Sequence, residues 1–155
     1  MRESLPLAAA LAHLFCASAL TGLIWMVQVV TYPQFLDVGR EAFTAFHDRY
    51  LGLVARVVMP LMLTELFLCA VVVFLSRGSA SLPWAIAGAV LLAGIWLSTA
   101  LLQVPLHRQL SAGFDADAVR SLVATNGIRT ILWTVRSAIA ALLVWRLAQP
   151  GDGHG

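Results

Sequence analysis

Residues 46–75 read FHDRYLGLVARVVMPLMLTELFLCAVVVFL, and this stretch decides the fold. Its first residues are polar, but from Leu51 to Leu75 it is apolar over a length that can cross a membrane as a helix. Glu65 interrupts the apolar run near its centre. A carboxylate at this depth in hydrocarbon is costly unless it finds a partner inside the protein. The stretch therefore predicts a spanning helix that packs against other helices and pairs Glu65 with a cation.

The composition of the whole chain is typical of a membrane protein. Of its 155 residues, 60% are hydrophobic and only 12% are charged, whereas about a quarter of the residues in a soluble domain are charged. Four apolar segments reach the length of about 20 residues that a spanning helix needs. They cover residues 7–30, 51–75, 83–106 and 128–147. We therefore predict an all-α, integral membrane four-helix bundle that forms a single domain over residues 1–149, followed by a disordered tail over residues 150–155.

Four spans place both chain ends on one side of the membrane and two longer connections on the other. In the second connection, Asp115 can cap a short helix from Ala116 to Asn126, because its carboxylate can accept hydrogen bonds from free backbone N–H groups. More arginines flank the connections than the chain ends, so the positive-inside rule predicts that the connections are cytoplasmic. A weak internal repeat aligns Gln28 with Gln103, which favours two helical hairpins related by pseudo-symmetry.

Polar side chains recur at helical spacing along the predicted spans and gather toward the end that carries the long connections. A polar side chain inside a membrane usually faces the bundle interior, where it finds a partner. These residues could line one pocket, or they could hold the helices together by interhelical hydrogen bonds. We predict a pocket lined by Gln28, Tyr32, His47, Tyr50, Gln103, His107, Asn126 and Arg129.

The chain contains histidines and cysteines, the residue types that serve metal and redox chemistry. His47 and His107 could ligate haem or a metal, since imidazole is the commonest metal ligand in proteins. They lack the spacing of known metal motifs, such as two histidines on one helical turn. Cys16 and Cys69 fall in apolar runs without a C-x-x-C motif, which is typical of buried hydrophobic cysteines. We therefore predict neither a bound metal nor a cofactor.

The partner of Glu65 follows from its depth in the membrane. Glu65 lies roughly 20 Å into its span at 1.5 Å per residue, and Arg136 lies roughly 12 Å into the fourth span from the same face. The long stem of the guanidinium can cover the difference, so we predict a buried ion pair between Glu65 and Arg136. His13 is the alternative partner, approaching from the opposite face. Such a pair either fixes the packing of the helices or tunes proton movement in the pocket.

Three stretches of the chain resemble a known family. They read WMVQVVTYPQF (25–35), FHDRYLGLVARVVMPLMLTEL (46–66) and NGIRTILWTVR (126–136). In these stretches, and in an Asn-x-x-Arg motif at Asn126 and Arg129, the chain resembles the anthrone oxygenase-like family of small four-helix bacterial membrane proteins. The resemblance implies a location in the bacterial cytoplasmic (inner) membrane. It also implies, from a few members, the oxidation of an anthrone to an anthraquinone without a bound cofactor.

The predicted function combines the pocket with this resemblance. Apolar walls with a few fixed polar groups suit an anthrone- or quinone-like aromatic molecule, or a lipid. In an oxygenase, His47 or His107 would act as the base. Arg129, Gln28 and Gln103 would stabilise the oxygen of the resulting enolate. The alternative is a non-enzymatic accessory subunit whose buried polar residues only hold the helices together. Membrane lipid is the other expected partner, and nothing in the sequence indicates binding to nucleic acid.

Overall fold

The fold is built from four long helical segments. The structure, a computed structural model, describes residues 4–149, and the predicted tail over residues 150–155 lies outside this range. The segments are α1 (Ser4–Met26), η1 (Val27–Thr31), α2 (Tyr32–Gln34) and η2 (Phe35–Asp37); α3 (Arg40–Leu75); α4 (Leu82–Ser98), η3 (Thr99–Gln103) and α5 (Val104–Ala112); and α6 (Ala116–Ala148). Each segment is long and apolar enough to cross a membrane, which confirms the predicted all-α, four-helix membrane bundle.

The helices extend well beyond the apolar segments. α3 has 36 residues, which corresponds to about 54 Å, whereas the hydrocarbon core of a bilayer is about 30 Å thick. α6 runs without a break from Ala116 to Ala148, so the short helix that we expected to end at Asn126 is the first part of the fourth span. That prediction was wrong because Gly127 remains helical. A glycine inside a helix costs about 1 kcal/mol, which is less than leaving the backbone groups of a break unpaired in a buried place.

The start of α6 is fixed by Asp115, as the sequence predicts. Its Oδ1 accepts hydrogen bonds from the backbone N–H groups of Asp117 and Ala118 at 2.9 and 3.1 Å. Gln109 Nε2 donates to its other carboxylate oxygen at 2.7 Å. These bonds, of which the one from Ala118 contributes most, lower the pKa of Asp115 below its ordinary value because they favour the ionised form. The cap is therefore fully charged at neutral pH.

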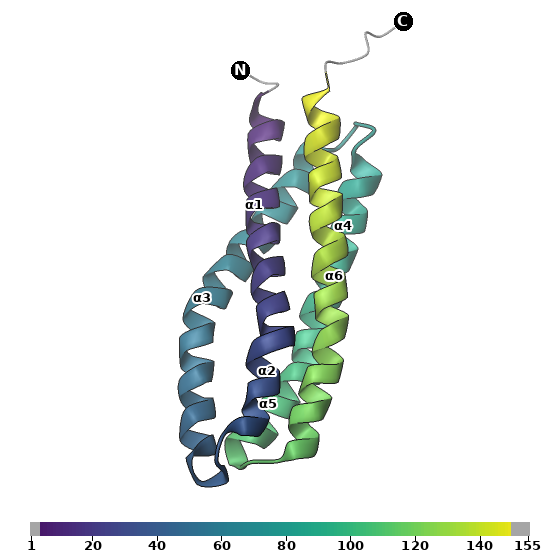
Figure 1. The fold of residues 1–155 in the computed structure, drawn as a ribbon. Coiled ribbons are helices and arrows are strands. Elements are labelled where there is room, and N and C mark those ends of the chain that lie inside the picture. Colours follow the sequence, from purple (N-terminus) through teal and green to yellow (C-terminus); the bar gives the residue numbers. More distant parts are fainter. Residues whose placement is uncertain (1–3, 150–155) are drawn as a thin grey trace, which may run out of the picture.

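The two ends of the bundle differ in what they carry. The first described residues of α1 and the last of α6 lie at one end, and the connections from η2 to α3 and from α5 to α6 lie at the other (Figure 1). We call the latter the connection end, and it includes residues 35–39 and 113–115. The sequence predicted long connections here, but these stretches are mostly helical, and the loop of residues 76–81 at the opposite end is longer than either connection. α6 packs against both α1 and α4, and α1 packs in turn against α3. α3 also packs against α4 and α5, which closes the four-helix bundle.

α3 stands away from the bundle over part of its length. Its buried residues are Phe43, His47, Met62, Glu65, Cys69 and Val72. Between His47 and Met62 no residue is buried, although most residues there are apolar. Figure 1 shows α3 bending part-way along its length, and Pro60 lies inside the helix. Proline explains such a bend, because it removes a backbone N–H and its ring crowds the preceding turn.

Two π-helices interrupt the first and third segments at corresponding places. Each has five residues and is followed at once by a short α-helix whose second residue is a proline, Pro33 after η1 and Pro105 after η3. A proline cannot bond the carbonyl four residues earlier and pushes against it. The wider π-turn accommodates this carbonyl. When the two π-helices are aligned, Thr31 corresponds to Gln103, whereas the repeat expected from the sequence aligned Gln28 with Gln103.

Candidate functional site

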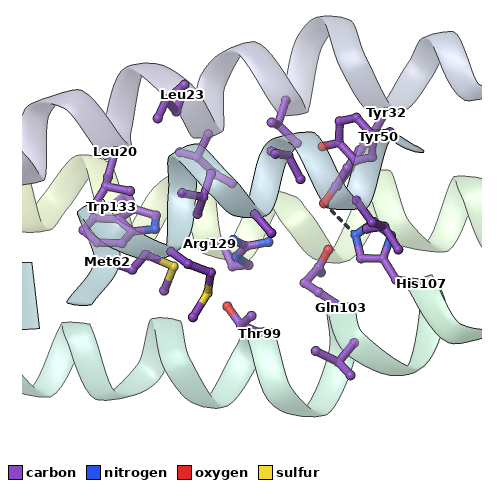
Figure 2. Close-up of a pocket in the computed structure, with 18 residues that line it drawn as sticks. Leu20, Leu23, Tyr32, Tyr50, Met62, Thr99, Gln103, His107, Arg129 and Trp133 are labelled. Carbon is purple, nitrogen blue, oxygen red and sulfur yellow. Dashed lines mark hydrogen bonds between the residues drawn. The ribbon is translucent and has the colours of Figure 1, made fainter. Parts of the chain in front are cut away.

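A cavity of about 300 Å³ lies beneath the part of α3 that stands away from the bundle. Apolar side chains, among them Leu20, Met62 and Trp133, surround one end of it, and polar side chains gather toward the other end (Figure 2). The polar lining residues are Tyr32, Tyr50, Thr99, Gln103, His107 and Arg129. A cavity with apolar walls and a few fixed polar groups is the usual form of a small-molecule site.

The two π-helices lie at the polar end of this cavity. Gln103 is the last residue of η3, and His107 lies one turn further along, in α5. Tyr32 follows η1 directly. π-turns inside α-helices are frequent at functional sites, because they change which residues face the interior. Here three of the six polar lining residues depend on these turns for their direction.

Arg129 is a buried cation for which the described residues provide no carboxylate. It is 8% exposed, and its Nη1 donates to Asn126 Oδ1 at 3.3 Å. Its Nε has no hydrogen-bond partner, and no ion pair within residues 4–149 includes it. Removing a guanidinium from water costs several kcal/mol unless its charge and its donors are satisfied. Arg129 therefore lines the cavity with a donor, its Nε–H, that no described residue accepts.

Gln103 lines the cavity and has one acceptor for which the described residues provide no donor. Its Nε2 donates to Thr125 Oγ1 at 2.9 Å. Thr125 uses its own hydroxyl hydrogen to bond the carbonyl of Ser121 at 2.7 Å, so toward Gln103 it can only accept. This fixes the orientation of the amide and leaves Gln103 Oε1, which is buried, without a partner. In Figure 2 the side chains of Gln103 and Arg129 point into the same space between the helices.

Five side chains connect the cavity with the surface of the connection end. Tyr32 Oη lies 3.0 Å from His107 Nε2, the bond drawn in Figure 2. His107 Nδ1 lies 3.0 Å from His47 Nε2, and His47 Nδ1 lies 3.2 Å from Ser111 Oγ. Ser111 Oγ donates to Asp48 Oδ1 at 2.8 Å. The chain runs from a buried tyrosine to an aspartate whose side chain is 58% exposed.

Aromatic rings hold the middle of this chain in place. Phe43 stacks on His47 with ring centroids 5.7 Å apart and planes 15° apart. Phe35 meets His47 edge-on at 5.7 Å, and both phenylalanines are fully buried. Rings in these positions restrict the rotation of the imidazole and keep bulk water away from it. The bond between His47 and His107 therefore lies in an apolar shell.

Three of the predicted pocket residues lie outside the cavity lining. His47 is buried behind His107. Asn126 Nδ2 donates to Gln28 Oε1 at 2.8 Å, and Gln28 Nε2 donates to the carbonyl of Val123 at 3.1 Å. These bonds join η1 to α6, and Asn126 also holds Arg129. The structure thus divides the predicted set into residues that line the cavity and residues that join helices.

Glu65 and Arg136 meet in a fully buried cluster outside the cavity lining. Arg136 Nε donates to Glu65 Oε1 at 2.6 Å, and Nη2 contacts the same oxygen. Nη1 donates to the carbonyl of Gly88 on α4. His13 Nε2 lies 3.1 Å from Glu65 Oε1 and 2.9 Å from Arg136 Nη2, so both partners considered from the sequence are present. A Cβ on Gly88 would lie 3.3 Å from Nη1, which shows how closely α4 approaches this arginine.

Several residues of the site were not found from the sequence. Ser111 and Asp48 extend the histidine chain, Thr125 orients Gln103, and the carbonyl of Gly88 binds Arg136. Two signals were available. Ser111 lies four residues after His107 and therefore on the same helical face, and Asp48 is adjacent to His47.

Comparisons with known proteins give no match. No protein-family model, curated protein or solved structure matches the chain. The resemblance to the anthrone oxygenase-like family stays a prediction from the sequence. Within residues 4–149, no group of three or more His, Cys, Asp or Glu side chains is placed to hold a metal ion. Cys16 and Cys69 are buried and free.

Proposed function

We propose that this membrane protein binds an apolar aromatic molecule with a ketone- or phenol-type oxygen and oxidises it without a bound cofactor. The observation that carries the proposal is the unpaired Arg129 and the free oxygen of Gln103 in an otherwise apolar cavity. The apolar walls would bind the ring system. The guanidinium would neutralise negative charge as it develops on the oxygen of the ligand. Anthrones and quinones combine these two properties.

The proposed reaction of an anthrone begins with loss of a proton from its methylene carbon. The proton passes to the Tyr32–His107 pair in the cavity wall, and the electron pair moves onto the ketone oxygen beside Arg129. Dioxygen then adds to the deprotonated carbon, and the resulting peroxide anion takes up one proton from the surrounding water and loses water to give the quinone. One anthrone and one dioxygen yield one anthraquinone and one water, so no further reductant is consumed.

The two histidines expected to act as bases take different positions. His107 lines the cavity and accepts a hydrogen bond from, or donates one to, Tyr32. His47 has no exposed surface and contacts His107 instead of the cavity. A general base must come within hydrogen-bond reach of the proton that it removes. We therefore assign proton removal to the Tyr32–His107 pair, with His47 in support.

A shallow groove on the outside suggests how the ligand enters. It is lined by Leu51, Val104, His107, Arg108 and Ser111. Leu51, Val104 and His107 line the inner cavity as well. The wall between α3 and α5 is therefore about one side chain thick at this place. We propose that an apolar ligand dissolved in the membrane enters between these two helices when Leu51 and Val104 move apart.

The alternative function is a non-enzymatic membrane subunit whose polar residues only join the helices. The bond between Gln28 and Asn126 and the cluster around Glu65 support this interpretation for their own parts of the molecule. The non-enzymatic alternative gives no role to the free Nε–H of Arg129 or to the free oxygen of Gln103. For this reason we prefer the ligand-binding function.

The test compares Arg129→Met with Arg56→Met in protein purified into lipid nanodiscs. Arg56 is exposed and lies outside the cavity lining, so its replacement is a matched control. Oxygen uptake and the absorbance of the quinone product are measured after addition of anthrone. We expect Arg129→Met to lower turnover by about 100-fold or more and Arg56→Met to leave it unchanged. Equal turnover in the two variants, or no binding and no oxidation by the parent, refutes the proposal.

A further inference from the structure

The hydrogen-bonded chain from Tyr32 to Asp48 has a direction, which follows from its last bond. An ionised Asp48 can only accept, so Ser111 donates to it. Ser111 has one hydroxyl hydrogen, and its oxygen can therefore only accept the bond from His47. His47 must carry its hydrogen on Nδ1.

The same reasoning orients the rest of the chain when both imidazoles are neutral. His47 accepts at Nε2, so His107 donates from Nδ1. His107 then accepts at Nε2, and the donor is the hydroxyl of Tyr32. Every donor in the chain points toward Asp48. The oxygen of Tyr32, which lines the cavity, keeps its lone pairs for a proton from the ligand.

We propose that this chain delivers the proton of the ligand to water at the connection end, with Ser111 and Asp48 as its exit. As a proton arrives on Tyr32 Oη, the proton of the tyrosine moves to His107 Nε2, and the Nδ1 proton of His107 moves to His47 Nε2. The Nδ1 proton of His47 passes through Ser111 to Asp48, which releases it to water. Each relay group gains one proton and loses one, so neither imidazole keeps a charge.

A relay solves a problem that one histidine cannot solve. A protonated His107 would place a second cation in the wall of the cavity that already contains Arg129, and like charges repel strongly where the dielectric constant is low. Water in the outer groove cannot take this proton directly, because both ring nitrogens of His107 are occupied by Tyr32 and His47. The groove does reach Ser111. Apart from Arg129 and Arg108, which lines the outer groove beside His107, the titratable groups near the two imidazoles among the described residues are Tyr32, Tyr50 and Asp48.

The direction of the chain is tested by ¹⁵N NMR of the histidine side chains in the full-length protein, in nanodiscs without ligand. The signals are assigned with His47→Gln and His107→Gln variants. We expect both imidazoles to be neutral at pH 7 and protonated on Nδ1. Hydrogen on Nε2 of either ring overturns the relay. This measurement needs no substrate, so it tests the relay even where the oxidation proposed above fails.

The exit is tested by substitution of Ser111. Ser111→Ala interrupts the chain, Ser111→Thr keeps a hydroxyl, and Ser121→Ala removes an exposed serine elsewhere at the connection end. We expect Ser111→Ala to bind anthraquinone as the parent does but to turn over anthrone roughly tenfold more slowly or worse. Ser111→Thr and Ser121→Ala should retain the parent rate. Parent-like turnover by Ser111→Ala overturns the relay. Turnover by Ser111→Thr that is as low as that of Ser111→Ala also overturns the relay. A parent that does not oxidise anthrone refutes only the proposed reaction.

Discussion

Arg129 and Arg136 lie seven residues apart on α6, and therefore on one face of the helix, yet their surroundings differ. Arg136 has no exposed surface and is bonded to Glu65, to the carbonyl of Gly88 and to His13. Arg129 is almost as deeply buried, but within residues 4–149 it donates one hydrogen bond, to the neutral amide of Asn126. The charge of the first is neutralised by the protein, and the charge of the second is not.

We interpret the difference as one between a structural arginine, Arg136, and the arginine that we propose binds the ligand, Arg129. A guanidinium whose donors all have partners can only be disturbed by mutation, because nothing remains for a ligand to bind. A guanidinium with a free donor in a cavity wall can still form a hydrogen bond with a ligand. Burial is nearly the same at both places, so the partners and not the depth decide the role.

Breaking the pair at Arg136 should have the largest effect on stability. Glu65→Ala leaves the guanidinium buried without a counter-charge, and we expect it to lower the free energy of unfolding by about 3–5 kcal/mol. Glu65→Gln keeps an acceptor oxygen but not the charge, so its stability should lie between that of Glu65→Ala and that of the parent. Reversible unfolding in mixed detergent, followed by circular dichroism, measures both.

A double variant controls for this effect. In Glu65→Leu/Arg136→Met both charges are gone, and apolar residues fill similar volume. Because such replacements are often neutral, we expect most of the lost stability to return. If Glu65→Ala alone were as stable as the parent, Arg136 would not depend on its partner and the comparison would lose its basis.

The close approach of α4 to Arg136 should give the second largest effect. A methyl group on Gly88 would crowd Arg136 Nη1, so Gly88→Ala should cost about 1–3 kcal/mol of stability. Gly94 on the same helix is the matched control, because its Cβ would lie at an ordinary 3.5 Å from Leu132. Gly94→Ala should be neutral or slightly stabilising, since alanine favours helix. Equal effects of the two substitutions in thermal unfolding would contradict the close approach.

Replacing Arg129 should change stability far less than replacing Arg136. Arg129→Met removes one hydrogen bond together with an uncompensated charge, so we expect the free energy of unfolding to stay within about 1 kcal/mol of the parent. Arg136→Met should lose as much stability as Glu65→Ala. The same unfolding measurement checks both variants. A loss at Arg129 as large as that at Arg136 would show that Arg129 is structural too.

The smallest effect concerns the cap of the helix that carries both arginines. The pKa of Asp115 is lowered from an ordinary value of 3.8. The stabilisation of the helix end by its ionised carboxylate is therefore fully present above about pH 3.8, and it is lost as the pH falls through the lower pKa of the folded state. As the pH falls through that lower pKa, hydrogen exchange at the amides of Asp117 and Ala118 should accelerate, after correction for the intrinsic pH dependence of exchange. Asp115→Asn, which still accepts at an N-cap, should show no such change. Acceleration that spreads along α6 as far as Arg129 would show that the position of this arginine depends on the helix end.

The sequence was sufficient for the parts of the fold that the bilayer imposes. Four spans were visible because a membrane helix needs about 20 apolar residues. Glu65 and Arg136 could be matched because depth along a helix follows directly from residue number. Asp115 could be identified as a cap because it acts on its own neighbours.

The division of the polar residues was not visible in the sequence. Whether His47 or His107 lines the cavity depends on how α3 bends and on how η1 and η3 turn the residues that follow them. Both features change side-chain directions without a change in hydropathy. The asymmetry between Arg129 and Arg136 was equally hidden, because it depends on carbonyls and amides of other helices.

Each π-helix also has a consequence for how this chain should be aligned with others. A π-turn holds one residue more than the α-turn that it replaces, so it acts as an insertion within a helix. Conversion of η1 to a regular α-helix without removal of a residue would rotate all that follows by about 100°, which would turn Tyr32 away from the cavity. A gap-free alignment with a relative that lacks the π-turn would therefore pair residues that face different directions. Such a comparison needs a gap inside the membrane span, where gaps are usually forbidden.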